Sequence, residues 1–130
     1  PDAGLNPALA HGAELLRAVE AGFGVATLSA DLPALQPAEL AAALAQIGPG
    51  HRGFVADEDA IGTTLLAAGP GAALLPAFGA GSRLTHLASG AVEIAAGAGL
   101  RRDVDTPADL DAVALLGVGP HTLAVLERLR

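Results

Sequence analysis

Short apolar runs of strand length alternate along this chain with segments that carry helix signals, and this alternation constrains the fold more than any other feature. The run at 23–30 is continuously apolar, as expected for a strand that is covered on both faces. Further strand-like runs lie at 54–57, 62–68 and 91–95. Strands that alternate with helices predict an α/β layered fold, with helices on both faces of a mostly parallel sheet.

Helix start and stop signals separate these runs. Asn6 is a good N-cap and Pro7 fits the first helical position, so we expect a helix over 4–22 that ends at a glycine. Thr106 is the N-cap expected for a later helix that begins at Pro107. Other helices are expected at 36–48, at 82–89 and from residue 120, and the segment 99–104 is expected to be extended.

Composition narrows the class of protein. The 130 residues are expected to form a single domain, and a net charge of −7 argues against a nucleic-acid partner. The sequence has no cysteine and no apolar run near the roughly 20 residues that span a bilayer, so we expect a cytoplasmic protein without a membrane partner. All 7 residues of the lysine and arginine class are arginine, so no lysine is present to neutralise a triphosphate.

Three aspartates follow predicted strands and are candidate metal ligands. Asp31 comes directly after the run at 23–30, and Asp103 and Asp105 lie in the segment "RRDVDTP". Ligands of open α/β sheets gather beyond the carboxyl ends of the strands, and Mg²⁺ binds one or two carboxylates together with phosphate oxygens and waters. The alternative interpretation is structural: Asp31 would start a turn, and the other two would be solvated acids before a capped helix.

A second candidate is "FGAGSRLTH" at 78–86. Two glycines before Ser82 expose backbone N–H groups and a hydroxyl, which suits an anion, although an ordinary loop with a serine cap has the same pattern. Thr63, in "GTT" at 62–64, offers a further hydroxyl. The four histidines, His86 among them, are poorer candidates, and they show no helical metal-ligand spacing, so a zinc site is not expected.

These segments together resemble one family. "GLNPAL", "LSADLPAL", "FVAD" with "GTT", "FGAGS", "SGAVEI" and "GLRRDVDTPADL" follow the family's order through nearly all of the chain. The chain resembles the guanylyltransferases that activate phosphoenolpyruvate or 2-phospho-L-lactate in the biosynthesis of the deazaflavin coenzyme F-420. These enzymes are similar to the molybdenum-cofactor guanylyltransferases, which places the expected sheet in the nucleotidyltransferase type of fold.

The resemblance implies a reaction and a set of site residues. GTP and a phosphorylated three-carbon acid would give a guanylyl diphosphate ester and pyrophosphate. Asp31 and Asp103 would be catalytic and would hold Mg²⁺, with Asp105 as a nearby alternative ligand. The acid substrate would bind at Thr63, Gly79 and Ser82. The nucleotide would lie near Gly4 and Asn6.

Two departures from the family pattern leave these ligands in place: Ala30 stands where glycine is usual, and Ile61 where threonine is common. The family also opens with a strand and a basic loop that holds the triphosphate. Nothing in this sequence matches them, so we expect the chain to correspond to the later part of the family fold.

Two other functions fit parts of the pattern. A glycosyltransferase that binds a sugar nucleotide through an Asp-x-Asp motif would use "DVD", but such a pair usually lies centrally in the chain. A non-catalytic fragment or binding module would show no magnesium-dependent nucleotide binding. Homodimerisation is compatible with the sequence and is kept as a hypothesis.

Overall fold

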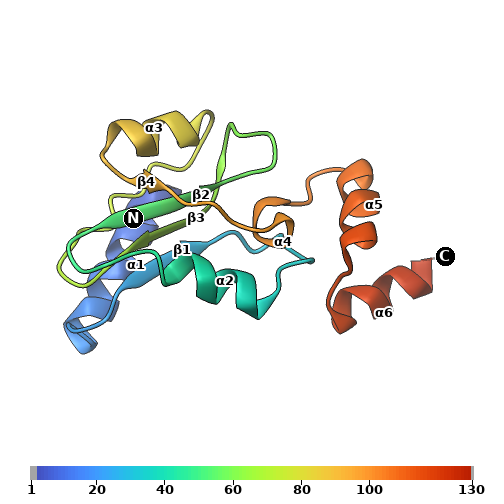
Figure 1. The fold of residues 1–130 in the computed structure, drawn as a ribbon, viewed down its shortest axis with the longest axis horizontal. Coiled ribbons are helices and arrows are strands. Elements are labelled where there is room, and N and C mark those ends of the chain that lie inside the picture. Colours follow the sequence, from blue (N-terminus) through green and yellow to red (C-terminus); the bar gives the residue numbers. More distant parts are fainter. Residues whose placement is uncertain (1–2, 130) are drawn as a thin grey trace.

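A computed structural model describes residues 3–129, which form one α/β body with a four-stranded sheet (Figure 1). The expected order of elements is confirmed except at residues 98–101, where a helical turn replaces the start of the segment expected to be extended. The elements are α1 (Leu5–Val19), β1 (Val25–Leu28), α2 (Pro37–Leu44), β2 (Arg52–Ala56), β3 (Thr63–Ala68), α3 (Ser82–Ala88), β4 (Val92–Glu93), α4 (Ala98–Arg101), α5 (Pro107–Leu116) and α6 (Pro120–Leu129).

The sheet is mixed, so the prediction of a mostly parallel sheet is wrong for the described residues. The strand order is β1-β3-β2-β4; β3 pairs antiparallel with both β1 and β2, and only β2 and β4 are parallel. The reason is the short connection at 57–62 between β2 and β3. A connection of this length allows a hairpin but not the crossover that parallel neighbours need.

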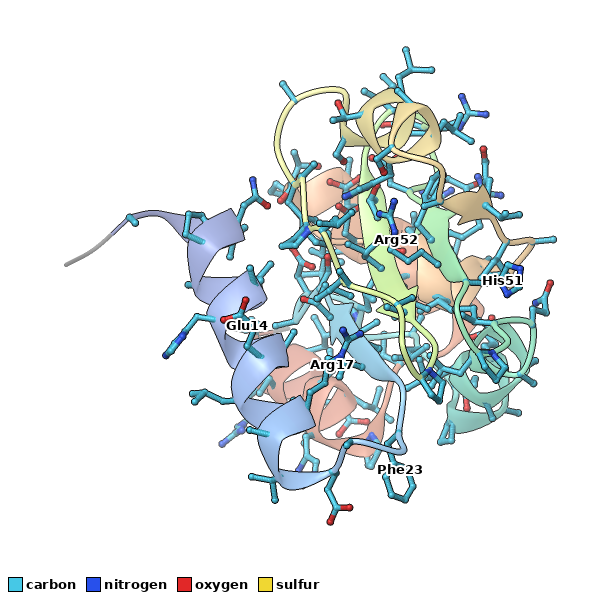
Figure 2. All side chains as sticks on the ribbon, turned by 90° about the vertical axis from the view of Figure 1, so that its left-hand side faces the viewer. Glu14, Arg17, Phe23, His51 and Arg52 are labelled. Carbon is cyan, nitrogen blue, oxygen red and sulfur yellow. The ribbon has the colours of Figure 1, made fainter. Side chains whose placement is uncertain are left out.

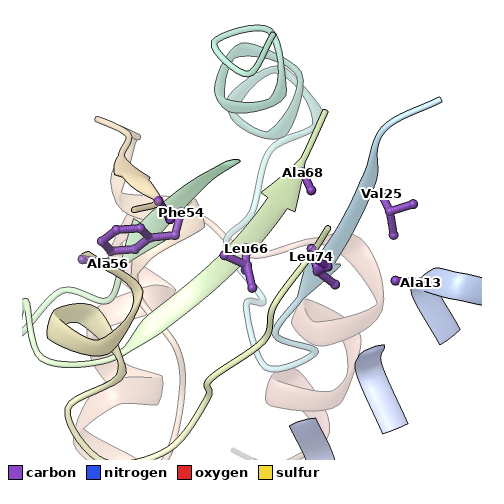
Figure 3. Close-up of a cluster of buried hydrophobic side chains, with 8 residues drawn as sticks. Ala13, Val25, Phe54, Ala56, Leu66, Ala68 and Leu74 are labelled. Carbon is purple, nitrogen blue, oxygen red and sulfur yellow. The ribbon is translucent and has the colours of Figure 1, made fainter. Parts of the chain in front are cut away.

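Two apolar clusters cover the two faces of the sheet, as the continuous apolar strands predict. Figure 3 shows the cluster between the sheet, α1 and the loop before α3, in which Phe54 and Leu66 are fully buried. The opposite cluster joins the sheet to α2 and α4 through Val55, Leu65 and Leu100, which are also fully buried. Every residue of β3 is buried, so this strand is the centre of the core.

A β-bulge interrupts β3 at its first residues. Val55 pairs with Leu65, but the next residue, Ala56, pairs with Thr63, so Thr64 is an extra residue opposite β2. Regular alternation from Leu65 would place Thr63 on the face of α2 and α4. Instead, the hydroxyl of Thr63 contacts α3, and that of Thr64 donates to the Leu100 carbonyl of α4 over 2.6 Å. The bulge therefore exchanges the faces of the two threonines.

Helix α1 is held against the loop that precedes α3. The Asn6 amide donates to the Phe78 carbonyl over 2.9 Å, and its oxygen accepts from the Phe78 N–H over 2.7 Å. Further along, Arg17 donates to the Ala72 carbonyl, and Figure 2 shows its side chain directed from α1 toward the sheet. The helix begins at Leu5 after Gly4, so the expectation that Asn6 is the N-cap is wrong.

The C-terminal third brings α5 and α6 to the end of the sheet where α4 lies (Figure 1). The segment expected to be extended at 99–104 contains α4, because residues 98–101 form one helical turn before the chain extends. Thr106 caps α5 as expected: its hydroxyl accepts from the Asp109 N–H, and the Asp109 carboxylate accepts from the Thr106 N–H. Among residues 3–129, no helix is long and apolar enough to cross a membrane.

Candidate functional site

The candidate site lies at one edge of the sheet, where β1 and β2 end and β3 begins. Leu28, at the end of β1, pairs with Leu65, and the Ser29 N–H continues this pairing by donating to the Thr64 carbonyl over 2.8 Å. Ala56, at the end of β2, pairs with Thr63. Asp57 directly follows β2, and Asp31 comes shortly after β1, so both leave the sheet at the same edge as Thr63.

Asp31 and the segment of Asp103 are joined through the backbone. The Val104 N–H donates to the Asp31 carbonyl over 3.1 Å. The approach of this segment is fixed from the other side by Thr64, which binds the Leu100 carbonyl. Residues 29–33 and 101–105 therefore lie side by side, as the prediction of a common site at the strand ends requires.

Negative charge predominates around Asp103. Burial raises the pKa of the Asp103 carboxyl, and the negative charges of Asp105, Asp31 and Asp57 raise it further. None of the salt bridges formed within residues 3–129 involves Asp31, Asp103 or Asp105. Carboxylates that repel one another without a cationic partner are suited to a hard divalent cation.

The carboxylates of Asp31 and Asp103 fit Mg²⁺ as two of its ligands, but the side chains of the described residues alone do not surround a metal ion. Among residues 3–129, no group of three or more acidic or histidine side chains is arranged to enclose a metal ion. Mg²⁺ is commonly held by one or two carboxylates, with substrate phosphates and waters completing its octahedron. The segments of Asp31 and Asp103, joined by the hydrogen bond from the Val104 N–H to the Asp31 carbonyl, would supply the oxygen donors of such a site.

The arginines beside this site stabilise the hairpin between β2 and β3. Arg101 donates to the Asp57 carbonyl over 3.0 Å, and Arg102 forms a 3.3 Å salt bridge with Glu58. The Asp57 carboxylate in turn accepts from the backbone N–H groups of Ile61 and Gly62, at 2.9 and 2.8 Å. The Asp57 carboxylate thus closes this turn.

The other half of the site is a buried network around Thr63. Ser82 Oγ donates to Thr63 Oγ1 over 3.1 Å, and His86 Nδ1 lies 2.9 Å from the same oxygen. The other ring nitrogen of His86 accepts from the Ala77 N–H over 3.0 Å. The structure therefore brings Thr63 and Ser82 together, and their binding of an acid substrate stays a prediction.

His86 is the residue of this network that sequence reasoning missed. Its ring is 0% exposed and packs 5.7 Å from the ring of Phe54 and 5.3 Å from that of Phe78. Burial lowers its pKa, and the charge of Arg52 lowers it further. The missed signal was the spacing from Ser82: residues four apart on a helix share one face, so both point toward β3.

The loop around Gly79 lies next to this network. Gly79 has φ 142° and Gly81 has φ 67°, conformations that favour glycine, so the sequence "GAG" is required by the backbone path. Asn6 binds the backbone of the preceding residue, Phe78, and Gly4 precedes α1. The predicted nucleotide contacts of Gly4 and Asn6 stay predictions; the observed role of Asn6 is to hold this loop.

The molecule is thus an α/β protein whose loops at one sheet edge gather carboxylates on one side and buried hydroxyls on the other. No protein family model matches the chain. Its sequence is, however, similar over nearly its whole length to curated proteins named phosphoenolpyruvate guanylyltransferase. The resemblance found from the motifs is therefore confirmed.

Three of these relatives show how far the similarity extends. The chain is 56% identical to the protein of Thermomonospora curvata over 131 aligned positions, which cover 99% of this chain and 58% of the relative. It is 56% identical to the protein of Streptomyces avermitilis and 55% identical to that of Streptomyces coelicolor, with 99% of this chain and 61% and 62% of the relatives covered. The chain spans about three-fifths of the length of these relatives.

Proposed function

We propose that this chain carries the acid-substrate and metal-binding part of a phosphoenolpyruvate guanylyltransferase, which joins GTP to phosphoenolpyruvate and releases pyrophosphate. The observation that carries the proposal is the identity of more than half of the residues with proteins of that name across 99% of the chain. The geometry supports it, because the two predicted halves of the site meet at one edge of the sheet. The fold type is proposed to be that of the nucleotidyltransferases.

Phosphoenolpyruvate has a carboxylate and a phosphate, and the buried network is suited to one of these anions. Thr63 keeps 8% of its surface exposed, whereas Ser82 keeps 2%, so Thr63 is the less completely buried member of the hydroxyl pair. Gly79 lies one turn before Ser82 and accepts a hydrogen bond from the Ser82 N–H over 3.2 Å. We assign the acid substrate to Thr63, Gly79 and Ser82, with 2-phospho-L-lactate as the alternative acid.

The reaction needs orientation and charge neutralisation rather than a base. A phosphate oxygen of the acid attacks the α-phosphorus of GTP, a new P–O bond forms, and the bond to pyrophosphate breaks. The attacking phosphate is already ionised at neutral pH, so no side chain has to accept a proton. The task of the chain is to hold the two phosphate-bearing substrates in line.

Asp31 and Asp103 are proposed to hold Mg²⁺, with Asp105 beside them. When bound, the ion neutralises the charge of the phosphates. The residues of the chain have two tasks: their carboxylates provide the oxygen donors, and the hydrogen bond between Val104 and Asp31 keeps the donors in one place. The predicted nucleotide contacts at Gly4 and Asn6 complete the proposal.

The test is pyrophosphate release from GTP with Mg²⁺ and either phosphoenolpyruvate or 2-phospho-L-lactate. Asp31→Asn is expected to lower the rate at least a hundredfold, because it removes a charged metal ligand. Asp59→Asn is the matched control, since this carboxylate lies on the exposed hairpin between β2 and β3, and it should retain the wild-type rate. Release that is independent of the acid, or an active Asp31→Asn protein, would contradict the assignment.

UDP-sugars serve as the competing substrates in the same assay. Turnover of a UDP-sugar in place of GTP would favour the glycosyltransferase that uses "DVD". If a folded protein shows no magnesium-dependent binding of any nucleotide, the non-catalytic alternative holds.

A further inference from the structure

His86 makes one polar contact with each of its ring nitrogens, and together the two contacts fix the position of its proton. The backbone N–H of Ala77 can only donate, so Nε2 of His86, 3.0 Å away, must offer a lone pair. A neutral imidazole with a bare Nε2 carries its hydrogen on Nδ1. Nδ1 therefore donates to Thr63 Oγ1 over 2.9 Å.

This tautomer determines whether the Thr63–Ser82 pair has a hydroxyl hydrogen that it can still donate to a ligand. Thr63 Oγ1 has two lone pairs, which accept from His86 Nδ1 and from Ser82 Oγ. The pair has two hydroxyl hydrogens, and only one of them lies between the two oxygens. The remaining hydrogen is left for an acceptor outside the network. The opposite tautomer would reverse this result, because a bare Nδ1 would take up that hydrogen itself.

An apolar packing role for His86 does not account for these contacts. The ring lies between Phe54 and Phe78, where a leucine or a phenylalanine would pack as well. A fully buried polar group is costly unless its hydrogen bonds are satisfied, and here both ring nitrogens are satisfied by partners at opposite ends of the ring. The arrangement links the backbone of the loop before α3 directly to the hydroxyl pair.

We propose that His86 is a positioning residue: as the Nδ1–H tautomer, it keeps the Thr63–Ser82 hydroxyl pair a hydrogen-bond donor toward an oxyanion of the acid substrate. This inference rests on the proposed function, because that function supplies the oxyanion. It adds a residue that touches no substrate but determines the polarity of the group that does.

Two substitutions separate the two ring nitrogens. The amide nitrogen of His86→Asn lies close to the position of Nδ1 and can still donate to Thr63. The longer side chain of His86→Gln reaches the position of Nε2 and loses the donor at Nδ1. We expect His86→Gln to raise the KM for phosphoenolpyruvate about tenfold or more while leaving the KM for GTP unchanged, and His86→Asn to restore most of the loss.

The coupling to Thr63 is tested in the same assay on the full chain. In a Thr63→Val background the oxygen through which His86 acts on the pair is already gone, so His86→Gln should cause little further increase in the KM for phosphoenolpyruvate. His121→Gln, an exposed histidine of α6, is the matched control and should leave both KM values unchanged. Equal effects of His86→Gln on both substrates, or additive effects in the double variant, would overturn the inference.

A second measurement is independent of activity. Nitrogen-15 NMR of the wild-type histidines reports which ring nitrogen carries the proton, and His86 should be the Nδ1–H tautomer at neutral pH. An Nε2–H tautomer would overturn the inference even in a fully active enzyme. Because this measurement uses the wild-type protein, it tests the inference even if the His86 variants do not fold. A wild-type protein with the expected tautomer but no guanylyl transfer would instead contradict the proposed function, and the assigned role of His86 would fail with it.

Discussion

The Val104 N–H donates to the Asp31 carbonyl over 3.1 Å, so two carboxylate segments from opposite ends of the chain are joined through their backbones. Side-chain substitutions at Asp31 or Asp103 leave this hydrogen bond intact. The charge of the site can therefore be changed without removing the contact that assembles it. This allows the contributions of charge to activity and to stability to be measured separately.

Asp103→Asn is expected to abolish magnesium-dependent turnover while raising stability at neutral pH. The pKa of Asp103 is raised in the folded state, so the folded protein binds a proton more readily than the unfolded chain does. Stability due to this group is present at low pH and is lost as the pH rises through the ordinary aspartate range, about 4, toward the raised pKa. Thermal unfolding should show a higher melting temperature for the variant at pH 7, with the difference vanishing near pH 3. A variant that melts below the wild type at both pH values would refute this account.

The pH dependence due to His86 has the opposite sign. Burial and the charge of Arg52 lower its pKa, so the folded state binds this proton less readily than the unfolded chain does. The corresponding stability is complete above the ordinary histidine pKa, about 6.5, and declines as the pH falls from there toward the lowered pKa. Urea unfolding at pH 7.5 and pH 5 should show a smaller decline for His86→Asn than for the wild type. An identical decline in both proteins would mean that another group titrates.

Gly99→Ala is expected to destabilise the fold by about 1–3 kcal/mol, because a Cβ at this position would overlap the Ala34 carbonyl oxygen and the Glu39 carboxylate. The substitution displaces α4, which leads into the Asp103 segment, so turnover should fall as well. Gly12→Ala is the matched control. A Cβ at Gly12 meets nothing within 4 Å, and the residue lies inside α1, so this variant should gain about 0.5–1 kcal/mol. Denaturant unfolding of the two proteins checks both signs.

Thr106→Ala should weaken α5 by about 1 kcal/mol, because it removes the hydroxyl that accepts from the Asp109 N–H. Hydrogen exchange of the α5 amides is the appropriate measurement, since local opening of this helix need not follow global unfolding. Thr122→Ala in α6 is the control, a threonine with no side-chain hydrogen bond recorded within the described part of the chain. If protection of α5 is the same in both variants, the cap contributes little.

Local chemistry made much of the fold predictable. Thr106 and Pro107 predicted the start of α5 correctly, because a capping box depends on residues three apart in the sequence. Asp31 was correctly placed after a strand, next to the segment of Asp103, because polar residues beyond buried strands share an edge of the sheet. Whether these carboxylates bind a metal is still a prediction.

Long-range pairing accounts for what was missed. Asn6 is of a residue type favoured at the N-cap, but its amide binds the backbone of Phe78, a partner that no local pattern indicates. The direction of the strands was misjudged because helices between apolar runs suggested crossovers, whereas the short connection after Asp57 forms a hairpin. His86 was overlooked because its partners, Thr63 and Ala77, come from two other segments.

The bulge in β3 has a consequence for how this sequence can be compared with others. Positions 63 and 64 both hold threonine, so a sequence alignment cannot show which of the two side chains points to which face of the sheet. One hydroxyl contacts Ser82 and His86, and the other anchors the helix that leads into the carboxylate segment. Two proteins could therefore share this pair of letters and still assign the two tasks in opposite ways. The backbone at one extra residue, rather than residue identity, determines which threonine contacts Ser82 and His86.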